Sequence, residues 1–369
     1  MLHYRSGSAI TVAEVHLRVT LRATGGATVT RDTRDGRWVE PWGEPEEVIS
    51  SGLWALPGLV DGHAHLAQGG VEIRPGDLDG AAVLAKMALG AGVGLILDKG
   101  WRDLTVVHLI DKVPAAARPE IEAAGVVLTV VGGFWEGFGR NVAPGDIGNM
   151  AAVAAGEGAG WIKLIGDWPR KGVGPVANFA EEELKEAVAA AREHGARVAV
   201  HTMAREVPSM AVRAGVDSIE HGLFLTGDDV EMLGARGGCW VPTVLQMEAT
   251  IKQLGERSSG GRLLLEGLEN VRARLATAVE AGVHVLTGTD LAIGTHEVAS
   301  EAIRLWELGM AAPAVIEAVS WSGLRATGRP VAFDLGSPAN AVLFSEDPVS
   351  NPRVLADPAA VIRMGRIVS

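Results

Sequence analysis

Hydrophobic positions between Gly58 and about Gly323 occur in short continuous runs, and a helical pattern follows most of them. The runs are rich in Val, Ile and Leu, whereas the helical patterns are rich in Ala, Glu, Arg and Leu. In chain order the runs read LPGLVDG, GVGLILD, GVVLTVV, GWIKLIG, ARVAVHT, VDSIEHG, GCWVPTV and VHVLTGTD. Continuous apolar runs that alternate with helices are typical of parallel strands covered on both faces. Eight runs over roughly 250 residues predict an α/β fold of the (β/α)8 TIM barrel type, with an open doubly wound sheet as the alternative.

The two ends of the chain differ from this central pattern. Residues 1–57 contain the alternating stretch AITVAEVHLRVTL and the turn-rich TRDTRDGRW, and residues 326–369 contain short apolar runs separated by prolines. Alternation with a period of two predicts strands that bury one face. We therefore expect the N- and C-terminal segments to combine into a small β-sandwich domain, beside a catalytic barrel domain over residues 58–325.

Composition narrows the class of protein. The chain has 369 residues, of which 47% are hydrophobic, so it is long enough for a large core. Its net charge of −12 argues against nucleic acid as a partner, because an acidic surface repels phosphate backbones. Cys239 is the only cysteine, which excludes an internal disulfide and a cluster of thiolate ligands.

Neither the N-terminus nor the most apolar window of the chain indicates a membrane protein. The N-terminus lacks the pattern of a signal peptide, and Lys86 interrupts the most apolar window, Ala81 to Leu97. We therefore expect a cytoplasmic protein that acts on a small molecule and binds no membrane, with assembly into a homo-oligomer left open.

Residues that bind metals stand at the ends of the predicted strands. Catalytic groups of a barrel collect at the carboxyl ends of its strands, so we expect these side chains to meet at one mouth. In the HAH motif, alternation points both imidazoles to the same side. Taken singly, each histidine is also compatible with an ordinary polar position at a strand end, but the set at one edge favours ligation by Zn²⁺ or a related divalent ion. The candidate ligands are His63, His65, Lys163, His201, His221 and Asp290.

Lys163 and Asp290 have chemistry that the histidines lack. A lysine ammonium repels a cation, but a lysine amine that reacts with CO2 becomes an anionic carbamate, which is able to bridge two metals. The alternatives are an unmodified lysine that pairs with Asp167 and one that contacts substrate. Asp290 is expected to be catalytic, since a carboxylate beside a metal-bound water can take the proton whose pKa the cation has lowered.

The order of these residues resembles that of the amidohydrolase superfamily, of the kind with a two-metal centre. That order is a histidine pair, a lysine, two separate histidines and an aspartate. The segments GWIKLIGD, IEHG, VPTV and TGTD most resemble the imidazolonepropionase-like and prolidase-like branch. The resemblance implies a barrel with a companion β-sandwich. It further implies a first metal bound by His63, His65 and Asp290, and a second bound by His201 and His221 and bridged to the first by carboxylated Lys163.

Two positions depart from the pattern of the branch, which the chain resembles over residues 58–325. Phe134 stands where the branch often has a histidine after a glycine pair, which weakens any transfer of substrate from known dipeptidases. Asn340 replaces an aspartate far from the chemistry. Aromatic and charged residues of the loops after the strands either line the mouth or pack the loops together. The candidate substrate contacts are Trp135, Arg140, Trp168 and His296.

These features favour a metal-dependent hydrolase in which a metal-bound hydroxide attacks the carbonyl of an amide, a cyclic amide or an ester. N-acyl amino acids, dipeptides and lactones are the expected substrate classes. The first alternative is a mononuclear zinc deaminase of a heterocycle, which needs no lysine bridge. The second alternative is a relative that binds a ligand without catalysis, although all six ligand positions are filled.

Overall fold

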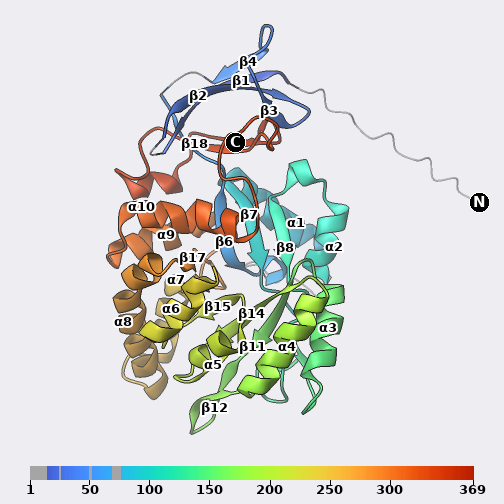
Figure 1. Cartoon of the computed structure of the whole chain (residues 1–369), viewed down its shortest axis with the longest axis vertical. Coiled ribbons are helices and arrows are strands. Elements are labelled where there is room, and N and C mark those ends of the chain that lie inside the picture. Colours follow the sequence, from blue (N-terminus) through green and yellow to red (C-terminus); the bar gives the residue numbers. More distant parts are fainter. Residues whose placement is uncertain (1–14, 25, 50–51, 69–75) are drawn as a thin grey trace, which may run out of the picture.

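A mixed sheet lies at one end of the molecule, and helices surround parallel strands in the rest of it (Figure 1). The computed structural model describes residues 15–24, 26–49, 52–68 and 76–369. Residues 9–14, which begin the alternating stretch expected near the N-terminus, lie outside the described residues.

Parallel strands form two sheets in the centre of the molecule. One sheet contains β6 (Leu59–Ala64), β7 (Val93–Asp98) and β8 (Glu120–Ala123), and the other has the order β10-β9-β11-β14-β15-β16-β17. Isolated parallel bridges join the sheets, since Ala64 pairs with Asp290 and Ala123 pairs with Gly160. The parallel arrangement predicted from the apolar runs is therefore confirmed. The strands of the second sheet are β9 (Leu128–Thr129), β10 (Arg140–Asn141), β11 (Trp161–Ile165), β14 (Arg197–Thr202), β15 (Ser218–His221), β16 (Cys239–Val241) and β17 (His284–Val285).

Helices alternate with most of these strands. Helix α4 illustrates how the sequence sets its ends: Glu183 accepts a hydrogen bond from the Ala180 N–H at 2.8 Å, three acids stand in the first turn, and Arg192 stands in the last. Among the described helices, none combines the length and the apolar composition of a membrane span. The α-helices are α1 (Leu78–Gly90), α2 (Thr105–Lys112), α3 (Ile147–Glu157), α4 (Glu181–Glu193), α5 (Val207–Ala214), α6 (Gly227–Ala235), α7 (Val244–Leu254), α8 (Ser259–Glu280), α9 (Val298–Glu307), α10 (Ala312–Ile316) and α11 (Ser322–Ala326).

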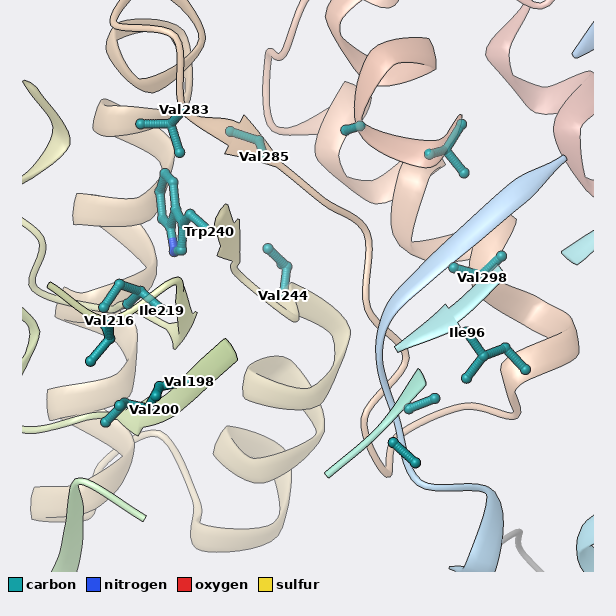
Figure 2. Packing of buried hydrophobic residues seen from close by; sticks show 14 of the residues in the cluster. Ile96, Val198, Val200, Val216, Ile219, Trp240, Val244, Val283, Val285 and Val298 are labelled. Carbon is teal, nitrogen blue, oxygen red and sulfur yellow. The ribbon is translucent and has the colours of Figure 1, made fainter. Parts of the chain in front are cut away.

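Alternation along the strands divides their side chains between two buried clusters. Val198 and Val200 of β14 belong to the larger cluster, which also contains helix residues such as Val298 of α9 (Figure 2). Ala199, between the two valines, belongs to a separate cluster with Trp161 of β11. Both faces of the strands are thus buried, which is why the runs are continuously apolar.

The two ends of the chain share an eight-stranded sheet, with the order β20-β19-β18-β5-β1-β2-β3 and β4 paired with β1. Strand β5 pairs antiparallel with β18, which joins an N-terminal strand to a C-terminal one. The contribution of both ends to one β structure was expected from their alternation. The strands are β1 (Leu17–Ala23), β2 (Thr28–Arg34), β3 (Arg37–Val39), β4 (Glu47–Ile49), β5 (Trp54–Leu56), β18 (Ala341–Phe344), β19 (Ala360–Arg363) and β20 (Arg366–Ile367).

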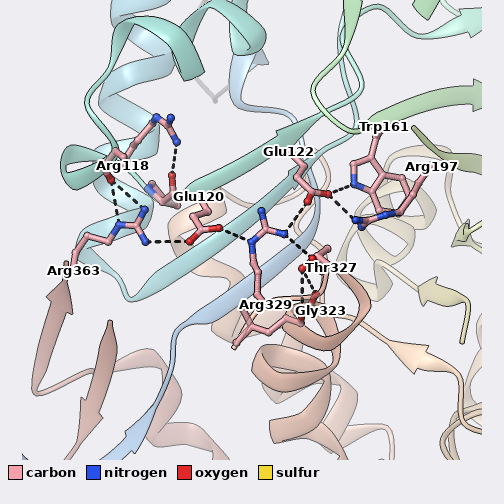
Figure 3. A network of polar contacts seen from close by, with 12 residues as sticks. Arg118, Glu120, Glu122, Trp161, Arg197, Gly323, Thr327, Arg329 and Arg363 are labelled. Carbon is pink, nitrogen blue, oxygen red and sulfur yellow. Dashed lines mark hydrogen bonds and ion pairs between the residues drawn. The ribbon is translucent and has the colours of Figure 1, made fainter. Parts of the chain in front are cut away.

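The third central strand differs from the prediction. The run GVVLTVV contributes only the short strand β9, whereas the strand that pairs with β7 is β8, with the sequence EIEA. Its glutamates are part of a polar network (Figure 3). Glu122 lies 2.8 Å from Arg329 Nη1 and accepts a hydrogen bond from Trp161 Nε1 at 2.5 Å, while Arg329 also pairs with Glu120. The two glutamates interrupt the apolar run by which the other strands are recognised in the sequence. They are tolerated in this strand because distant residues pair with their charges.

A hairpin that the sequence did not predict follows β11. Strands β12 (Asp167–Arg170) and β13 (Gly174–Ala177) pair antiparallel, with Trp168 opposite Val176. The hairpin extends from the end of the molecule opposite the mixed sheet (Figure 1). It therefore adds a wall to the edge at which the parallel strands end.

Candidate metal centre

One cavity of about 890 Å³ is lined by all six predicted ligands. Four of the side chains are buried, and those of His65 and Asp290 are only slightly more exposed, at 9% each against 2% for His63. The residues come from widely separated elements at the carboxyl edge of the strands. His63, Lys163, His201 and His221 lie in β6, β11, β14 and β15, and His65 and Asp290 follow β6 and β17.

Strand alternation aims Lys163 at the interior. Ile162 and Leu164 on either side belong to the larger hydrophobic cluster. Trp161, two residues before Lys163, belongs to the separate cluster that also contains Ala199. His201 has the same relation to Ala199 on β14, and the register of the two strands pairs Ile165 with His201. The two side chains thus point into the same space from neighbouring strands.

His63, His65 and Asp290 form a compact group whose ligand atoms lie within 4.8 Å of one another. Asp290 Oδ1 lies 3.4 Å from His65 Nε2 and 3.7 Å from His63 Nε2. His65 Nδ1 lies 2.7 Å from the carbonyl oxygen of Gly100, which can only accept a hydrogen bond. His65 therefore donates from Nδ1 and presents an unprotonated Nε2 to Asp290 when the ring is neutral.

His201 and His221 form a second group on the neighbouring strands. His201 Nδ1 and His221 Nε2 face each other at 2.9 Å, and His221 Nδ1 lies 2.6 Å from the hydroxyl of Thr243. Two buried atoms beside them have no hydrogen-bond partner among the described residues, namely His201 Nε2 and Lys163 Nζ. Buried polar atoms are normally paired, so these atoms are typical of a site that takes a ligand.

The protonation states of the site suit a cation. Burial above all lowers the pKa of His63 and His201 well below the ordinary value, and it lowers that of His221 to about 3. Burial acts to raise the pKa of Asp290, but His63 and His65 outweigh it and bring the value to about 2. At neutral pH the three imidazoles are neutral and the aspartate is ionised. These are the forms in which histidine and aspartate bind a divalent metal ion, so the residues present fit such an ion.

The backbone departs from regular strand geometry at the site. His221, Thr243 and Asp290 have left-handed φ angles of 64°, 46° and 49°, which are unusual for residues with a side chain. Glu220 already points inward on β15, so a regular strand would turn His221 outward. The left-handed angle instead lets both neighbours reach the interior. Such angles cost roughly 1–3 kcal/mol each and gather at functional sites.

Buried carboxylates fix the loops that carry the first group. Asp61 accepts hydrogen bonds from the N–H of His63 at 3.1 Å and from the hydroxyl of Thr289 at 2.6 Å. Asp98 accepts from the N–H of Gly100 at 2.8 Å, and Gly100 supplies the carbonyl that contacts His65. The sequence offered no signal for this supporting role beyond the position of each aspartate at the end of an apolar run.

Aromatic side chains form one wall of the cavity. Trp135 and Trp168, two of the predicted substrate contacts, line it, with ring centroids 5.3 Å apart. Phe134 packs on Trp168 at 4.7 Å, and Trp168 reaches the ring of His201 at 5.8 Å. Trp101 lies 5.4 Å from His65. The rings therefore both line the cavity and pack against one another, beside ligands of both groups.

The structure does not place the other two predicted substrate contacts in the cavity lining. Arg140 pairs with Glu157 at 2.9 Å. His296 folds over its own loop, where a Cβ on Gly294 would meet its ring. Arg170 lines the cavity instead, and its side chain donates a hydrogen bond to Asn178 at 2.9 Å. Within the described part of the chain Arg170 has no ion pair, and its position two residues after Trp168 on β12 is the signal that places it on the same wall.

Known proteins resemble the chain over most of its length. The sequence model of the amidohydrolase family matches residues 54–368. An uncharacterized protein of Mycobacterium tuberculosis is 31% identical over 340 residues, which cover 90% of each chain. Ochratoxinase of Aspergillus niger is 24% identical over 326 residues, which cover 85% of this chain and 66% of that protein.

Solved structures share the fold. A Xaa-Pro dipeptidase with bound methionine has a TM-score of 0.80 and 21% identity, with 96% of this chain and 99% of that chain covered. The crystal structure of A. niger ochratoxinase has a TM-score of 0.79 and 17% identity, with 96% of both chains covered. The fold is therefore TIM-barrel-like α/β.

Asp167 connects the hairpin to the loop that follows His201. Its Oδ2 accepts hydrogen bonds from the N–H groups of Met203 at 2.8 Å and Ala204 at 3.0 Å, while Oδ1 has no hydrogen-bond partner among the described residues. Burial raises the pKa of Asp167 from 3.8 to about 7. The folded state therefore favours the protonated carboxyl group.

We expect the pH dependence of stability to reveal this group. The stabilisation from protonated Asp167 is complete below its ordinary pKa and is lost as pH rises through about 7. Asp167→Asn keeps an acceptor for both N–H groups and cannot ionise. Between pH 4 and 8 the free energy of unfolding of the wild type should therefore fall relative to that of the variant by roughly a few kcal/mol, at about 1.4 kcal/mol for each pKa unit. Urea unfolding at several pH values measures this difference, and a difference that is constant with pH would contradict the prediction.

Proposed function

Because the chain belongs to the amidohydrolase family, in its prolidase-like branch, and is a hydrolase of carbon–nitrogen bonds, we propose that it cleaves an amide or cyclic amide with two divalent metal ions. The observation that carries the proposal is the convergence of six candidate ligand side chains on one cavity. The proposed ligands of the first ion are His63, His65 and Asp290, and those of the second are His201 and His221. Zn²⁺ is the proposed ion, since imidazoles and a carboxylate suit it.

Lys163 is proposed to bridge the two ions as a carbamate. Its buried Nζ lies at the inner end of the cavity without a hydrogen-bond partner in the described chain. In the proposed modification the amine nitrogen attacks the carbon of CO2, a new N–C bond forms, and one proton leaves the nitrogen. The product would be an anion with two oxygens, which could supply a ligand to each of the two ions.

Asp290 is proposed to move the proton of the reaction. Bound ions would lower the pKa of a coordinated water toward neutrality and polarise the substrate carbonyl. Asp290, ionised at neutral pH and next to His63 and His65, would accept the proton of the attacking water at Oδ1 and return it to the leaving nitrogen. The imidazoles of His63, His201 and His221, whose pKa values are lowered, hold the site without competing for that proton.

The cavity supports a substrate with an aromatic or large apolar group and an anionic group. Trp168 lies beside His201 and Trp135 packs against Trp168, while Arg170 offers a guanidinium on the same wall. A guanidinium binds a carboxylate well because its donors match the two oxygens. We propose an N-acyl amino acid or a dipeptide as the substrate class, with esters and lactones as the nearest competitors. One relative with this fold is a dipeptidase.

The proposed architecture follows the same logic. We infer that the bridges of Ala64 with Asp290 and of Ala123 with Gly160 complete a (β/α)8 barrel over residues 58–325. Residues 1–57 and 326–369 would then form the companion β-sandwich domain. Their shared eight-stranded sheet supports this division.

Two other functions compete with this proposal. A mononuclear deaminase would need one metal ion and no carbamate, and a non-catalytic relative would tolerate the loss of a ligand. The Lys163 amine, which lines the same cavity as both histidine groups and has no hydrogen-bond partner among the described residues, favours the dinuclear hydrolase over both. A screen of N-acyl amino acids, dipeptides, lactones and cyclic ureas, with enzyme loaded with zinc or manganese in bicarbonate, tests the reaction class directly.

Replacing Asp290 should abolish proton transfer. We expect Asp290→Asn to lower kcat by roughly 10²–10⁴-fold on a substrate found in the screen, because an amide cannot accept the proton. Circular dichroism should show an intact fold. The matched control is Asp334→Asn, an exposed aspartate outside the cavity lining, which should keep the wild-type rate. Near-normal turnover by Asp290→Asn would refute the role assigned to it.

The carbamate has a spectroscopic signature. Protein loaded with zinc in ¹³C-bicarbonate should give a carbamate carbon resonance and hold two ions per chain. Lys163→Arg should lose the resonance and at least one ion, because a guanidinium does not form a stable carbamate. Lys185→Arg on the surface of α4 is the control. Two ions without any carbamate resonance in the wild type would refute the bridge, and a single ion would favour the deaminase.

Arg170 should select substrates that carry a carboxylate. We expect Arg170→Met to raise KM roughly 10- to 100-fold for such a substrate, as the loss of a charged hydrogen bond would. KM for the same compound with its carboxylate converted to an amide should stay unchanged. Arg140→Met is the matched control, because Arg140 pairs with Glu157 away from the cavity. An equal effect of Arg170→Met on both compounds would exclude a carboxylate clamp.

A further inference from the structure

A lysine and a glutamate that the proposed reaction does not use are buried beneath the candidate ligands. Lys99, which follows β7, and Glu220, in β15, are both fully buried, and Lys99 Nζ lies 3.2 Å from Glu220 Oε1. Removing two charges from water is costly, and replacing such a pair by apolar residues often leaves stability unchanged. Stability alone therefore does not explain the pair.

The two oxygens of Glu220 have different neighbours. Oε1 accepts a hydrogen bond from the hydroxyl of Ser218 at 2.6 Å and faces Lys99, whose Nζ lies 4.4 Å from the ring centre of Trp161. Oε2 faces Nδ1 of His63 at 2.6 Å. Lys99 and Ser218 thus hold one oxygen and direct the other at the imidazole.

We propose that Glu220 is a positioning residue for His63, and that Lys99 holds Glu220 in place. In this proposal Oε2 accepts the Nδ1–H of His63, because the two atoms lie 2.6 Å apart and neither has another hydrogen-bond partner among the described residues. The Nε2 lone pair is then directed toward Asp290, 3.7 Å away. A histidine that binds a metal usually donates its other N–H to such a partner, which fixes the ring and raises its basicity. The inference rests on the proposed metal centre, because it concerns the nitrogen that His63 would offer to the first ion.

The other histidines have different partners at the equivalent nitrogen. His65 Nδ1 contacts the carbonyl of Gly100, and His221 Nδ1 contacts the hydroxyl of Thr243. Of these three partners, Glu220 is the charged one. The bond of His63 to the first ion would therefore be the one supported by a charged partner, and the affinity for that ion would be sensitive to the loss of Glu220.

Two double variants separate positioning from stability. Lys99→Met/Glu220→Met removes both charges with side chains of similar length and leaves His63 Nδ1 without an acceptor. Lys99→Met/Glu220→Gln also removes both charges but retains a carbonyl oxygen that can accept from Nδ1. The affinity of the metal-free, full-length protein for the first Co²⁺ ion is read from the visible absorption of the bound ion, and thermal unfolding is measured alongside.

We expect the Glu220→Met double variant to unfold near the wild-type temperature and to bind the first Co²⁺ roughly 10- to 100-fold more weakly. The Glu220→Gln double variant should regain most of the affinity. Asp229→Asn is the control for loss of a buried carboxylate elsewhere, since Asp229 pairs with the hydroxyl of Ser209 at 2.6 Å, away from the cavity lining. It should lower the unfolding temperature and leave the affinity unchanged.

Equal affinities of the two double variants, whether normal or weakened, would overturn the role of Glu220. Absence of Co²⁺ binding by the wild type would instead overturn the metal centre itself, so the two failures are distinguishable. A measurement on the wild-type fold decides the matter even where a double variant does not fold. In ¹⁵N-histidine-labelled, metal-free protein, the resonances lost in His63→Gln should belong to a ring protonated at Nδ1, and a ring protonated at Nε2 would refute the proposal.

Discussion

The alternation of side chains along parallel strands with two buried faces is the constraint on which the site depends. Each strand residue points either to the helices or to the interior, and neither direction leads to water. A polar residue near the carboxyl end of a strand therefore reaches the inner end of the cavity. Lys163 and His201 follow this rule on neighbouring strands, where the parallel register pairs Ile165 with His201. The positions of these candidate ligands are thus a consequence of the same packing that builds the core.

Where regular alternation would fail, the chain departs from strand geometry. His221 comes directly after the inward-pointing Glu220 and reaches the interior only because its φ angle is 64°. Trp240 Nε1 donates a hydrogen bond to the carbonyl of His221 at 2.9 Å, and the N–H of Asp290 donates to the carbonyl of His63 at 2.7 Å. These buried bonds hold the left-handed residues in place, so the stable strands on either side offset the local strain.

The sequence predicts the features that local pattern and strand position determine. The parallel strands, the contribution of both chain ends to one sheet, and the edge at which the six candidate ligands meet all follow from periodicity. Strand β8 does not, because Glu120 and Glu122 alternate with apolar residues and are paired by Arg329, more than two hundred positions away. Local pattern also fails to distinguish the two loop arginines. Arg140 is drawn to Glu157 while Asn178 holds Arg170 at the cavity, and both partners are set by tertiary contacts.

The presence of two lysines near one glutamate also has a physical reason. A lysine that reacts with CO2 must give up its proton, and burial, which lowers the pKa of Lys163 to about 8, assists that loss. A buried glutamate, by contrast, needs a cation that stays charged. One lysine cannot meet both requirements, since carboxylation would turn the only counter-charge of Glu220 into a second anion. In the proposed centre the requirements are divided: Lys163 lines the cavity where CO2 can reach it, whereas Lys99 is enclosed against Trp161 and Glu220. A carbamate can then form on Lys163 while Lys99 still balances the negative charge of Glu220, the residue that supports His63.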